Sequence, residues 1–300
     1  MRALIFSDIH IHNYPSQNES RLVKCIECLK EIFQHAKAGN YNTILFAGDL
    51  YDQGKKLHPL VVDAVLNTLR ECFKANPAVT FYAISGNHDQ AGHHLIAKPT
   101  QTALSHLVKV FPGRFVLLDN VSMEIEDCVV HGVPYYVKVS DARQMINERA
   151  KQIVHGKVNI LLNHQHHPGC EFGADFILED VDNFNYVFTG HIHQHQPYLQ
   201  KSMFSVGSPI WRDAADYNDP KGWLYLDTDL ATVTRHYYET VEAPVLTVKP
   251  VALFGSDITT GVENLLESVE SIITSFVRDA FPDDELKQIE YIKAGLNYIQ

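Results

Sequence analysis

The sequence has few of the features that would place a protein outside the cytoplasm. Only five of its 300 residues are cysteines, at scattered positions, which excludes the dense, even-numbered disulfide framework of small secreted proteins. No apolar run approaches the roughly 20 residues that cross a bilayer, and the first residues lack the pattern of a signal peptide. We therefore expect a soluble protein of the reducing cytoplasm that makes no contact with a membrane.

An excess of basic residues is also missing, although nucleic-acid-binding proteins usually carry one. The chain has 25 Lys and Arg against 36 Asp and Glu, which gives a net charge of −11. Residues 241–300 hold ten acids and four bases, which accounts for −6 of this total. The first 240 residues are thus only mildly acidic, and the composition weakens a nucleic-acid-binding function without excluding it.

A second CxxC pair is absent too, although Cys25 and Cys28 form one such pair. The pair lies in a segment whose apolar residues recur at helical spacing. We expect two thiols on or beside the core-facing stripe of a helix, and not a redox or zinc site. Internal repeats and low-complexity tracts are not found in the sequence.

Short β-rich runs alternate with helical patterns along the chain, which is typical of an α/β fold. We expect strands at residues 4–6, 43–46, 80–84, 129–137, 159–162, 186–188, 204–206, 223–227 and 233–238. Helical spacing of apolar residues is found at 21–37, 59–73, 100–110 and 142–154. The length suits one catalytic domain, 1–240, and a small addition, 241–300, with a possible strand at 245–251 and an amphipathic helix at 262–277.

Five polar clusters follow predicted strands. They are Asp8-Ile9-His10, Gly48-Asp49, Gly86-Asn87-His88-Asp89, Asn163-His164 and Gly190-His191-Ile192-His193. Each cluster alone would more often be a turn or a helix cap. Ligands of open α/β sheets, however, bind outside the carboxyl ends of the strands, so all five clusters should meet at one edge. Their coincidence predicts a metal site.

The donors in these clusters are carboxylates, an amide oxygen and imidazoles, without a thiolate. This mixture suits Mn, Fe or Zn better than Mg or Ca. The donors are too many for one tetrahedral ion, so we expect two ions. A carboxylate can bridge two ions that lie roughly 3.5 to 4 Å apart, which is the geometry that supports in-line displacement at phosphorus. Two divalent ions outweigh the charge of two carboxylates, so the site should attract phosphoesters, diesters and monoesters alike. Other histidines near the motifs should be flanking surface residues: His12, His93, His94, His166, His167 and His195.

The order DxH, GD, GNHD, H and GHxH resembles that of the calcineurin-like metallophosphoesterases, and every element is present. Within this superfamily, residues 48–52, 86–89, 161–165, 190–193 and 206–209 resemble SbcD-type nucleases, the nuclease subunits of a complex that processes double-strand breaks. Residues 219–223 are similar to a segment of the recombination nuclease subunits of tailed phages. The resemblance covers about residues 1–240. It implies an α/β fold, a two-sheet αββα sandwich, with a small C-terminal α+β capping region at 241–300.

The resemblance also implies a role for each site residue. Asp8, His10 and His193 would hold the first ion, and Asn87, His164 and His191 the second. Asp49 would bridge the two ions, which in this family are usually Mn. His88 would assist the leaving group, and Asp52 and Asp89 would orient the ligands. Lys55 and Lys56 follow the second motif and could contact DNA phosphates, although a solvated loop explains them equally well.

The implied function is that of a Mn-dependent DNA exonuclease and endonuclease acting on DNA ends or branched structures. It would work with an SMC-like ATPase subunit (SbcC type) in the cytoplasm, which is the host cytoplasm if the chain is phage-encoded. The resemblance also suggests a homodimer. His12 stands where many relatives have a small residue, and the short tail departs from relatives that continue into ATPase-binding segments. The alternative is a small-molecule phosphodiesterase or phosphatase. A non-enzymatic scaffold is disfavoured, because it need not keep a full ligand set.

Overall fold

The computed structural model describes residues 1–13, 19–90, 102–170, 172–198, 202–212 and 219–238. Apart from Glu19, these residues belong to one compact unit. Three expected features lie outside the described residues: the strand at 245–251, the helix at 262–277 and the capping region at 241–300. In the described part of the chain, no helix has the length and apolar character needed to span a membrane.

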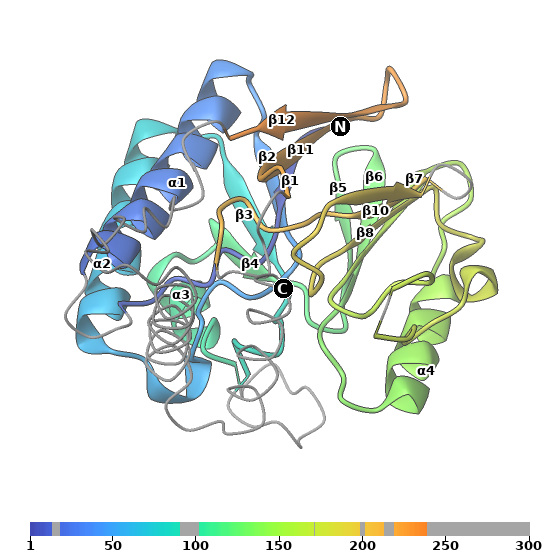
Figure 1. Ribbon diagram of the computed structural model, residues 1–300. Helices are drawn as coiled ribbons and strands as arrows, with labels where there is room; N and C mark the ends of the chain where they lie inside the picture. Colours follow the sequence, from blue (N-terminus) through green and yellow to red (C-terminus); the bar gives the residue numbers. More distant parts are fainter. Residues whose placement is uncertain (14–18, 91–101, 171, 199–201, 213–218, 239–300) are drawn as a thin grey trace, which may run out of the picture. The chain divides into compact units, whose positions relative to one another are not determined.

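Two six-stranded sheets form the centre of this unit (Figure 1). The first has the order β12-β11-β1-β2-β3-β4, with β1 (Arg2–Phe6), β2 (Thr43–Phe46), β3 (Thr80–Ala83), β4 (Phe115–Leu117), β11 (Gly222–Asp227) and β12 (Thr232–Tyr237). The second has the order β5-β6-β7-β8-β10-β9, with β5 (Ser122–Ile125), β6 (Cys128–Val133), β7 (Val158–Asn163), β8 (Tyr186–Thr189), β9 (Gln196–Tyr198) and β10 (Met203–Ser205). The strands β1 to β4 run parallel to one another, as do β6, β7 and β8.

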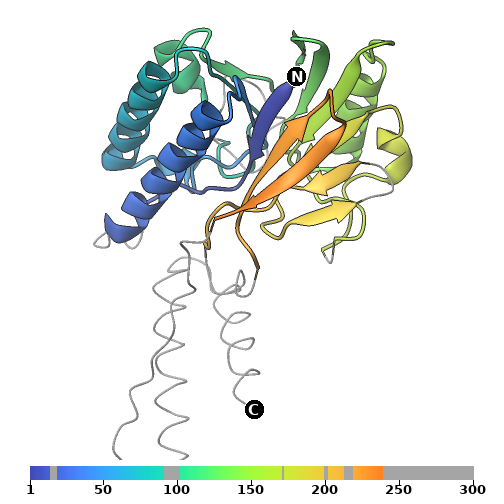
Figure 2. The same ribbon diagram turned by 90° about the horizontal axis from the view of Figure 1, so that it is seen from above.

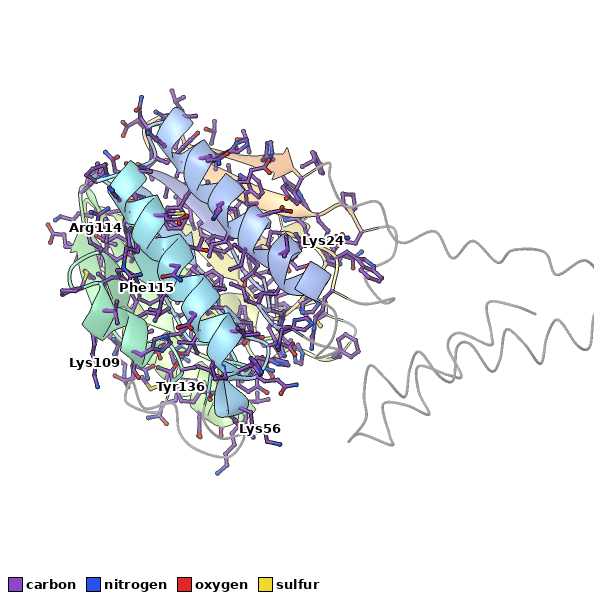
Figure 3. The ribbon with its side chains drawn as sticks, turned by 90° about the vertical axis from the view of Figure 1, so that its left-hand side faces the viewer. Lys24, Lys56, Lys109, Arg114, Phe115 and Tyr136 are labelled. Atoms are coloured by element: carbon purple, nitrogen blue, oxygen red, sulfur yellow. The ribbon has the colours of Figure 1, made fainter. Side chains whose placement is uncertain are left out.

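Alternate side chains of the first sheet are buried on opposite faces, as the period of two in a strand requires. In β1, Leu4 and Phe6 join the core under the helices, whereas Ile5 joins the core between the sheets. The helices on the outer face are α1 (Glu19–Ala38), α2 (Pro59–Ala75) and α3 (Ser105–Val110). Figures 2 and 3 show α1 and α2 side by side over this sheet. Cys25 and Cys28 lie in the same core, buried and reduced, as expected from the helical pattern.

The second sheet repeats the arrangement on the other side. In β7, Ile160 and Leu162 pack toward the first sheet, and Leu161 packs in the outer cluster with Ala142 and Ile146 of α4 (Val139–Ala150). Two short 3-10 helices, η1 (Gly54–Lys56) and η3 (Leu178–Val181), complete the described elements. The fold is therefore the αββα sandwich that the sequence resemblance implied.

The observed elements differ from the expected ones at a few places. The strand expected at 129–137 ends at Val133, because Pro134 has no N–H to donate to the sheet. The helix expected from residue 100 begins at Ser105; before it, the Thr102 hydroxyl accepts the N–H of Leu104 and favours a turn. Three short strands were not expected, namely β4, β5 and β9. They carry three or four residues each, too few for a recognisable alternating pattern.

Candidate metal centre

The polar clusters meet where the carboxyl ends of parallel strands from both sheets face each other. Asp8 and His10 follow β1, Asp49 follows β2, and Asn87 follows β3. From the second sheet, His164 follows β7, and His191 and His193 follow β8. The expectation that strand ends deliver these residues to one place thus agrees with the structure.

Four of these residues have a left-handed backbone. The φ angles are 54° at Asp8, 47° at His10, 62° at Asp49 and 79° at His191. Such angles in residues other than glycine each cost on the order of 1–3 kcal/mol and cluster at functional sites. Here they turn the chain sharply just past a strand end, so that side chains close in sequence reach the same small volume.

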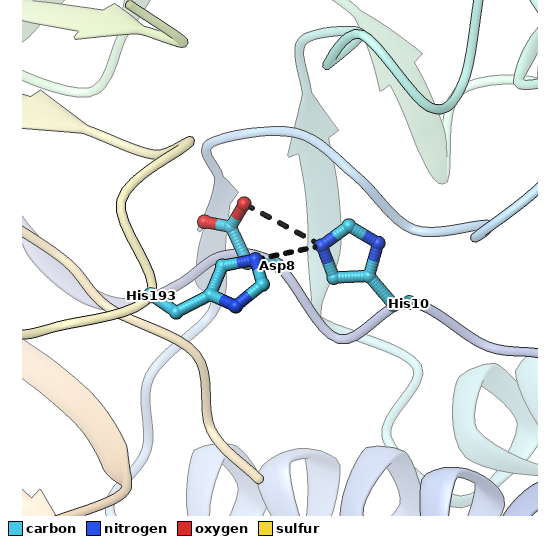
Figure 4. Close-up of side chains that lie close together, drawn as sticks. All are labelled: Asp8, His10 and His193. Atoms are coloured by element: carbon cyan, nitrogen blue, oxygen red, sulfur yellow. Dashed lines mark hydrogen bonds and ion pairs between the residues drawn. The ribbon is translucent and has the colours of Figure 1, made fainter. Parts of the chain in front are cut away.

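Asp8, His10 and His193 form the first group of possible ligands (Figure 4). The Nε2 atoms of His10 and His193 lie 3.1 Å apart, and His10 Nε2 lies 3.8 Å from Asp8 Oδ1. The backbone N–H of His191 donates to the Asp8 carboxylate at 3.1 Å and so links the loops after β1 and β8. One ion between these side chains would have a carboxylate and two imidazole ligands.

Asp49, His164 and His191 form the second group, and Asn87 joins it. Asn87 Oδ1 lies 2.9 Å from His191 Nδ1 and 3.1 Å from His164 Nε2. His164 Nδ1 donates to the Ala47 carbonyl at 2.6 Å, which leaves Nε2 directed at the centre. This group offers the amide oxygen and the imidazole nitrogens expected for a second ion.

Asp49 lies between the two groups. Its Oδ2 is 3.3 Å from His164 Nε2 and 3.6 Å from His10 Nε2, and its Oδ1 accepts the backbone N–H of His88 at 2.8 Å. Burial opposes ionisation, but the surrounding imidazoles, chiefly His164 and His88, hold the pKa of Asp49 well below its usual range. Its Oδ2 lies nearer to both of these imidazole nitrogens than Asp8 Oδ1 does, which is 3.8 Å from His10 Nε2 and 3.9 Å from His164 Nε2, so Asp49 is the better placed carboxylate to contact an ion in either group.

The charges of the buried side chains in the centre favour the binding of cations. Burial disfavours a charged His164, yet the carboxylates of Asp49 and Asp8 raise the pKa of this imidazole to about 9. Burial lowers the pKa of His10 and His191 well below the usual value, so both are neutral and able to coordinate. Two fully buried carboxylates that converge with neutral nitrogen donors fit a pair of divalent cations.

Asp89 holds the loops after β2 and β3 together. Its Oδ2 accepts backbone N–H bonds from Asp49 at 2.8 Å, Gly86 at 3.1 Å and Leu50 at 3.3 Å, and its Oδ1 accepts that of Tyr51 at 3.0 Å. Burial and the neighbouring Asp49 raise the pKa of Asp89 to about 8, although the N–H bonds from Tyr51 and Gly86 oppose this shift. The side chain therefore positions Asp49 through the backbone.

Asp52 and His88 lie beside the first group. Asp52 Oδ1 is 3.3 Å from His10 Nδ1 and 3.1 Å from a guanidinium nitrogen of Arg212. Burial opposes ionisation of Asp52, but His10 and Arg212 lower its pKa far below the usual range. His88 Nδ1 donates to the Asp52 carbonyl at 2.6 Å, and the His88 ring meets that of His10 edge to face at 4.7 Å between centroids.

Lys55 and Lys56 are exposed in η1, next to this part of the site. Gly54 N–H donates to the His88 carbonyl at 2.8 Å, which fixes η1 against the His88 loop. Figure 3 shows Lys56 at the end of the molecule where α2 begins. The two ammonium groups lie outside the cluster of ligands, on the surface beside it.

The expectation that the other histidines are flanking surface residues is wrong for His167, whereas His12, His166 and His195 are partly exposed. His167 is buried, His12 Nδ1 bonds to the His10 carbonyl at 2.7 Å, and the His166 ring lies 4.4 Å from that of His191. His195 Nδ1 donates to the Ser205 carbonyl at 2.8 Å. His93 and His94 lie outside the described residues.

Sequence reasoning also missed several residues that support the site. Asp119 binds both the N–H and the hydroxyl of Ser85, at 2.8 and 2.7 Å, and so fixes the chain that leads to Asn87. The Tyr135 ring lies 5.1 Å from that of His191. An acid directly after an apolar run (residues 115–118) was the available signal for Asp119; Tyr135 stands in no motif and offered none.

A family model described as calcineurin-like phosphoesterase matches residues 1–195, which include every residue of the cluster. The chain belongs to this family. Its members use a dinuclear metal centre, so the chain is a phosphoester hydrolase with such a centre. The sequence is also similar to Exonuclease subunit 1 of Enterobacteria phage T4, with 19% identity over 208 residues. That match covers 68% of this chain and 58% of the phage protein, less than two thirds of its length.

Solved structures with the same fold include a dimetal phosphatase from Danio rerio. It has a TM-score of 0.50 and 11% identity, and the match covers 75% of this chain and 91% of that one. An archaeal phosphodiesterase is similar with a TM-score of 0.41 and 13% identity, over 79% of this chain and 100% of that one. At these identities the likeness concerns the fold alone.

Proposed function

We propose that the chain is a Mn-dependent DNA nuclease that hydrolyses phosphodiester bonds at DNA ends or branched structures. The observation that carries this choice of substrate is the similarity to Exonuclease subunit 1 of phage T4 over 68% of the chain. Because the match spans only 58% of the phage protein, its activity is transferred here as a proposal. We further propose that the enzyme works in the cytoplasm with an SMC-like ATPase subunit, as a homodimer, and that 241–300 serves as a capping or partner-binding region.

We assign the ligands by the two groups in the structure. Asp8, His10 and His193 would hold one ion, and Asn87, His164 and His191 would hold the other. Asp49 would contact both, since its Oδ2 lies within 3.6 Å of a nitrogen in each group. When bound, the two ions supply Lewis acidity that polarises the phosphoryl group and favours attack by water.

His88 is proposed as the catalytic residue of the chain. Its Nδ1–H is engaged by the Asp52 carbonyl, so the ring is held in one orientation and Nε2 is the atom left for the substrate. The side chain is 27% exposed, which lets a leaving oxygen reach it. A positioned imidazole that protonates a leaving alkoxide contributes typically 10²- to 10⁴-fold, on the order of 3–5 kcal/mol of barrier.

Two surface features beside the centre suit a nucleic acid. Phe172 is 76% exposed, and its ring lies 6.0 Å from that of His166, which lies 4.4 Å from the His191 ring. An exposed aromatic ring can stack on a base without regard to sequence. Lys55 and Lys56, on the surface beside the His88 loop, would neutralise backbone phosphates despite the overall negative charge.

The test is Mn-dependent cleavage of linear DNA, closed circular DNA and a chromogenic phosphodiester by the purified full chain. We expect linear DNA to be degraded, closed circular DNA to be cut more slowly, and the diester to be hydrolysed weakly. Hydrolysis of the chromogenic diester with no cleavage of linear, hairpin or single-stranded DNA, with and without an ATPase partner, would refute the DNA substrate and leave the phosphoesterase site intact.

The second candidate is a phosphodiesterase or phosphatase that acts on small nucleotides. Its support is the net charge of −11, which does not favour a polyanion such as DNA. Rapid hydrolysis of a free nucleotide, without cleavage of DNA, would establish this second function in place of the DNA nuclease.

A further inference from the structure

A second cluster of metal-binding side chains lies outside the dinuclear centre. It consists of Glu31 and His35 on α1 and His236 on β12, and we call it the α1–β12 cluster. None of the three belongs to the loops after β1, β2, β3, β7 or β8 that form the centre. The proposed phosphoesterase chemistry leaves these residues without a role.

The three side chains are arranged to share one ion. A possible ligand atom of each lies within 4.8 Å of those of the other two. Glu31 and His35 are four residues apart on α1, the spacing that puts side chains on one face of a helix, and Glu31 Oε1 lies 3.8 Å from His35 Nε2. The His35 and His236 rings are 4.4 Å apart between centroids. All three residues are half-buried, so an ion could enter from solvent.

Tyr225 orients His35 as the outer partner of a coordinating imidazole does. His35 Nδ1 lies 2.7 Å from the Tyr225 hydroxyl oxygen, which also accepts the Trp223 Nε1–H at 3.1 Å. In the tautomer whose Nδ1–H donates to this oxygen, His35 Nε2 keeps its lone pair and faces Glu31. Histidines that bind metals almost always donate the other ring N–H in this way. The Trp223 ring stacks on His236 at 4.5 Å, which fixes the third ligand.

The electrostatics of this end of α1 also favour a cation. Glu31 and His35 stand in the last two turns of the helix, which ends at Ala38. The carbonyl groups at a helix C-terminus carry partial negative charge, and Glu31 adds a carboxylate to them. A cation bound here would join the end of α1 to β12, the last strand of the first sheet along the described chain.

We propose that Glu31, His35 and His236 bind a single zinc ion in a site of two imidazoles, one carboxylate and one water. Nitrogen-rich donor sets of this kind suit zinc better than Mg or Ca, and three protein ligands leave the fourth tetrahedral position to water. The site ties α1 to β12 and acts on stability, because an ion that binds the folded chain alone shifts the folding equilibrium toward it.

The experiment counts zinc in the full chain. The wild type, Glu31→Gln, His35→Gln and His155→Ala are dialysed against excess Zn²⁺ and their zinc content is measured. Glu31→Gln keeps the shape of the side chain, and His155→Ala removes an exposed histidine on another part of the surface. We expect three zinc ions per chain in the wild type and in His155→Ala. In Glu31→Gln and His35→Gln we expect two zinc ions, or a third that binds at least about tenfold more weakly than in the wild type.

Crystals of the zinc-loaded wild type locate the extra ion. We expect an anomalous peak at the zinc edge between Glu31, His35 and His236. Zinc should also raise the Tm of the wild type further than that of Glu31→Gln. Equal zinc counts in all four proteins, with no peak at this place, would overturn the proposal, and circular dichroism of the variants shows that a lost ion is not a lost fold. Neither result bears on hydrolysis at the dinuclear centre.

Discussion

At the scale of single residues, His88 differs from His10 and His164. These two histidines are fully buried among carboxylates, whereas His88 keeps part of its ring exposed and is oriented by a backbone carbonyl. The exposed part of the His88 ring is accessible to a substrate.

Replacement of His88 by Asn should therefore remove turnover and spare metal binding. We expect the rate to fall by roughly 10²- to 10⁴-fold, the usual contribution of a positioned general acid. Metal content, measured by elemental analysis, should stay at the wild-type value. The exposed His155→Asn serves as a control with unchanged rate. Normal turnover in the His88 variant would contradict its assigned role.

A second prediction at this scale concerns the effect of a side chain at Gly190. A Cβ at this position would lie 2.3 Å from the Ala47 carbonyl oxygen and 2.7 Å from His164 Nδ1, the two atoms whose hydrogen bond orients His164. We expect Gly190→Ala to weaken metal binding about tenfold or more, measured by titration calorimetry, and to lower stability by about 1–3 kcal/mol.

Gly113→Ala is the control for this change. It also adds a methyl group, at a φ of 72° with nothing within 4 Å, so stability should fall slightly and metal affinity should not change. Equal metal affinity in both variants would show that the close approach at Gly190 does not position His164.

The sequence predicted which residues the structure brings together at the candidate site, and it did not predict their contacts. DxH, GD, GNHD and GHxH name the side chains, because coordination chemistry restricts which residue types can stand there. Asp119 and Ser85 form no such pattern, since their partnership depends on two strands, β3 and β4, that become neighbours only in the fold. The buried position of His167 depends in the same way on loop packing.

At the scale of elements, the loop after β2 and the loop after β3 behave as one unit because Asp89 binds both. Its carboxylate accepts four backbone N–H groups, three of them from residues 49–51. An amide in its place offers one acceptor oxygen and directs an NH₂ group at a donor.

Asp89→Asn should consequently loosen the placement of Asp49. Each buried N–H left without an acceptor costs about 1–3 kcal/mol, so we expect a lower Tm together with a metal affinity reduced by roughly 10- to 100-fold. Activity measured against Mn²⁺ concentration gives the affinity. Asp63→Asn, on the exposed side of α2, should match the wild type in both measurements. An unchanged metal requirement in Asp89→Asn would argue against this role.

The buried central strands could be predicted from their sequences, and the edge strands β4, β5 and β9 could not. β2 was expected at 43–46 and lies there, since an apolar run between two helical patterns is typical of a strand buried on both faces. β5 has one buried residue out of four and alternates weakly, so its pairing with β6 is set by the tertiary fold.

At the scale of the whole molecule, the buried Asp119 couples folding to pH. Burial raises the pKa of Asp119 to about 6, against an ordinary value of 3.8, although Ser85 opposes this through two hydrogen bonds. Between pH 4 and 6 the folded chain thus holds a proton that the unfolded chain has lost. The contribution of this group to stability is greatest below this window and falls as the pH rises through it.

Asp119→Asn should remove this dependence. The difference in unfolding free energy between variant and wild type should shift in favour of the variant by about 1–3 kcal/mol from pH 4 to pH 7. Urea unfolding of the metal-free proteins at several pH values gives the measurement. A difference that stays constant over this range would mean that Asp119 titrates at its ordinary value.

The order of the ligands along the chain has a consequence for the protein while it is being translated. The cluster starts at Asp8 and is complete only with His193, and its halves come from two different sheets. A chain still growing on the ribosome has Asp8, His10, Asp49 and Asn87 long before it has the imidazoles of the second sheet. It therefore cannot assemble the complete cluster of ligands, and we expect the hydrolase to stay inert until its β7–β8 region has emerged and paired.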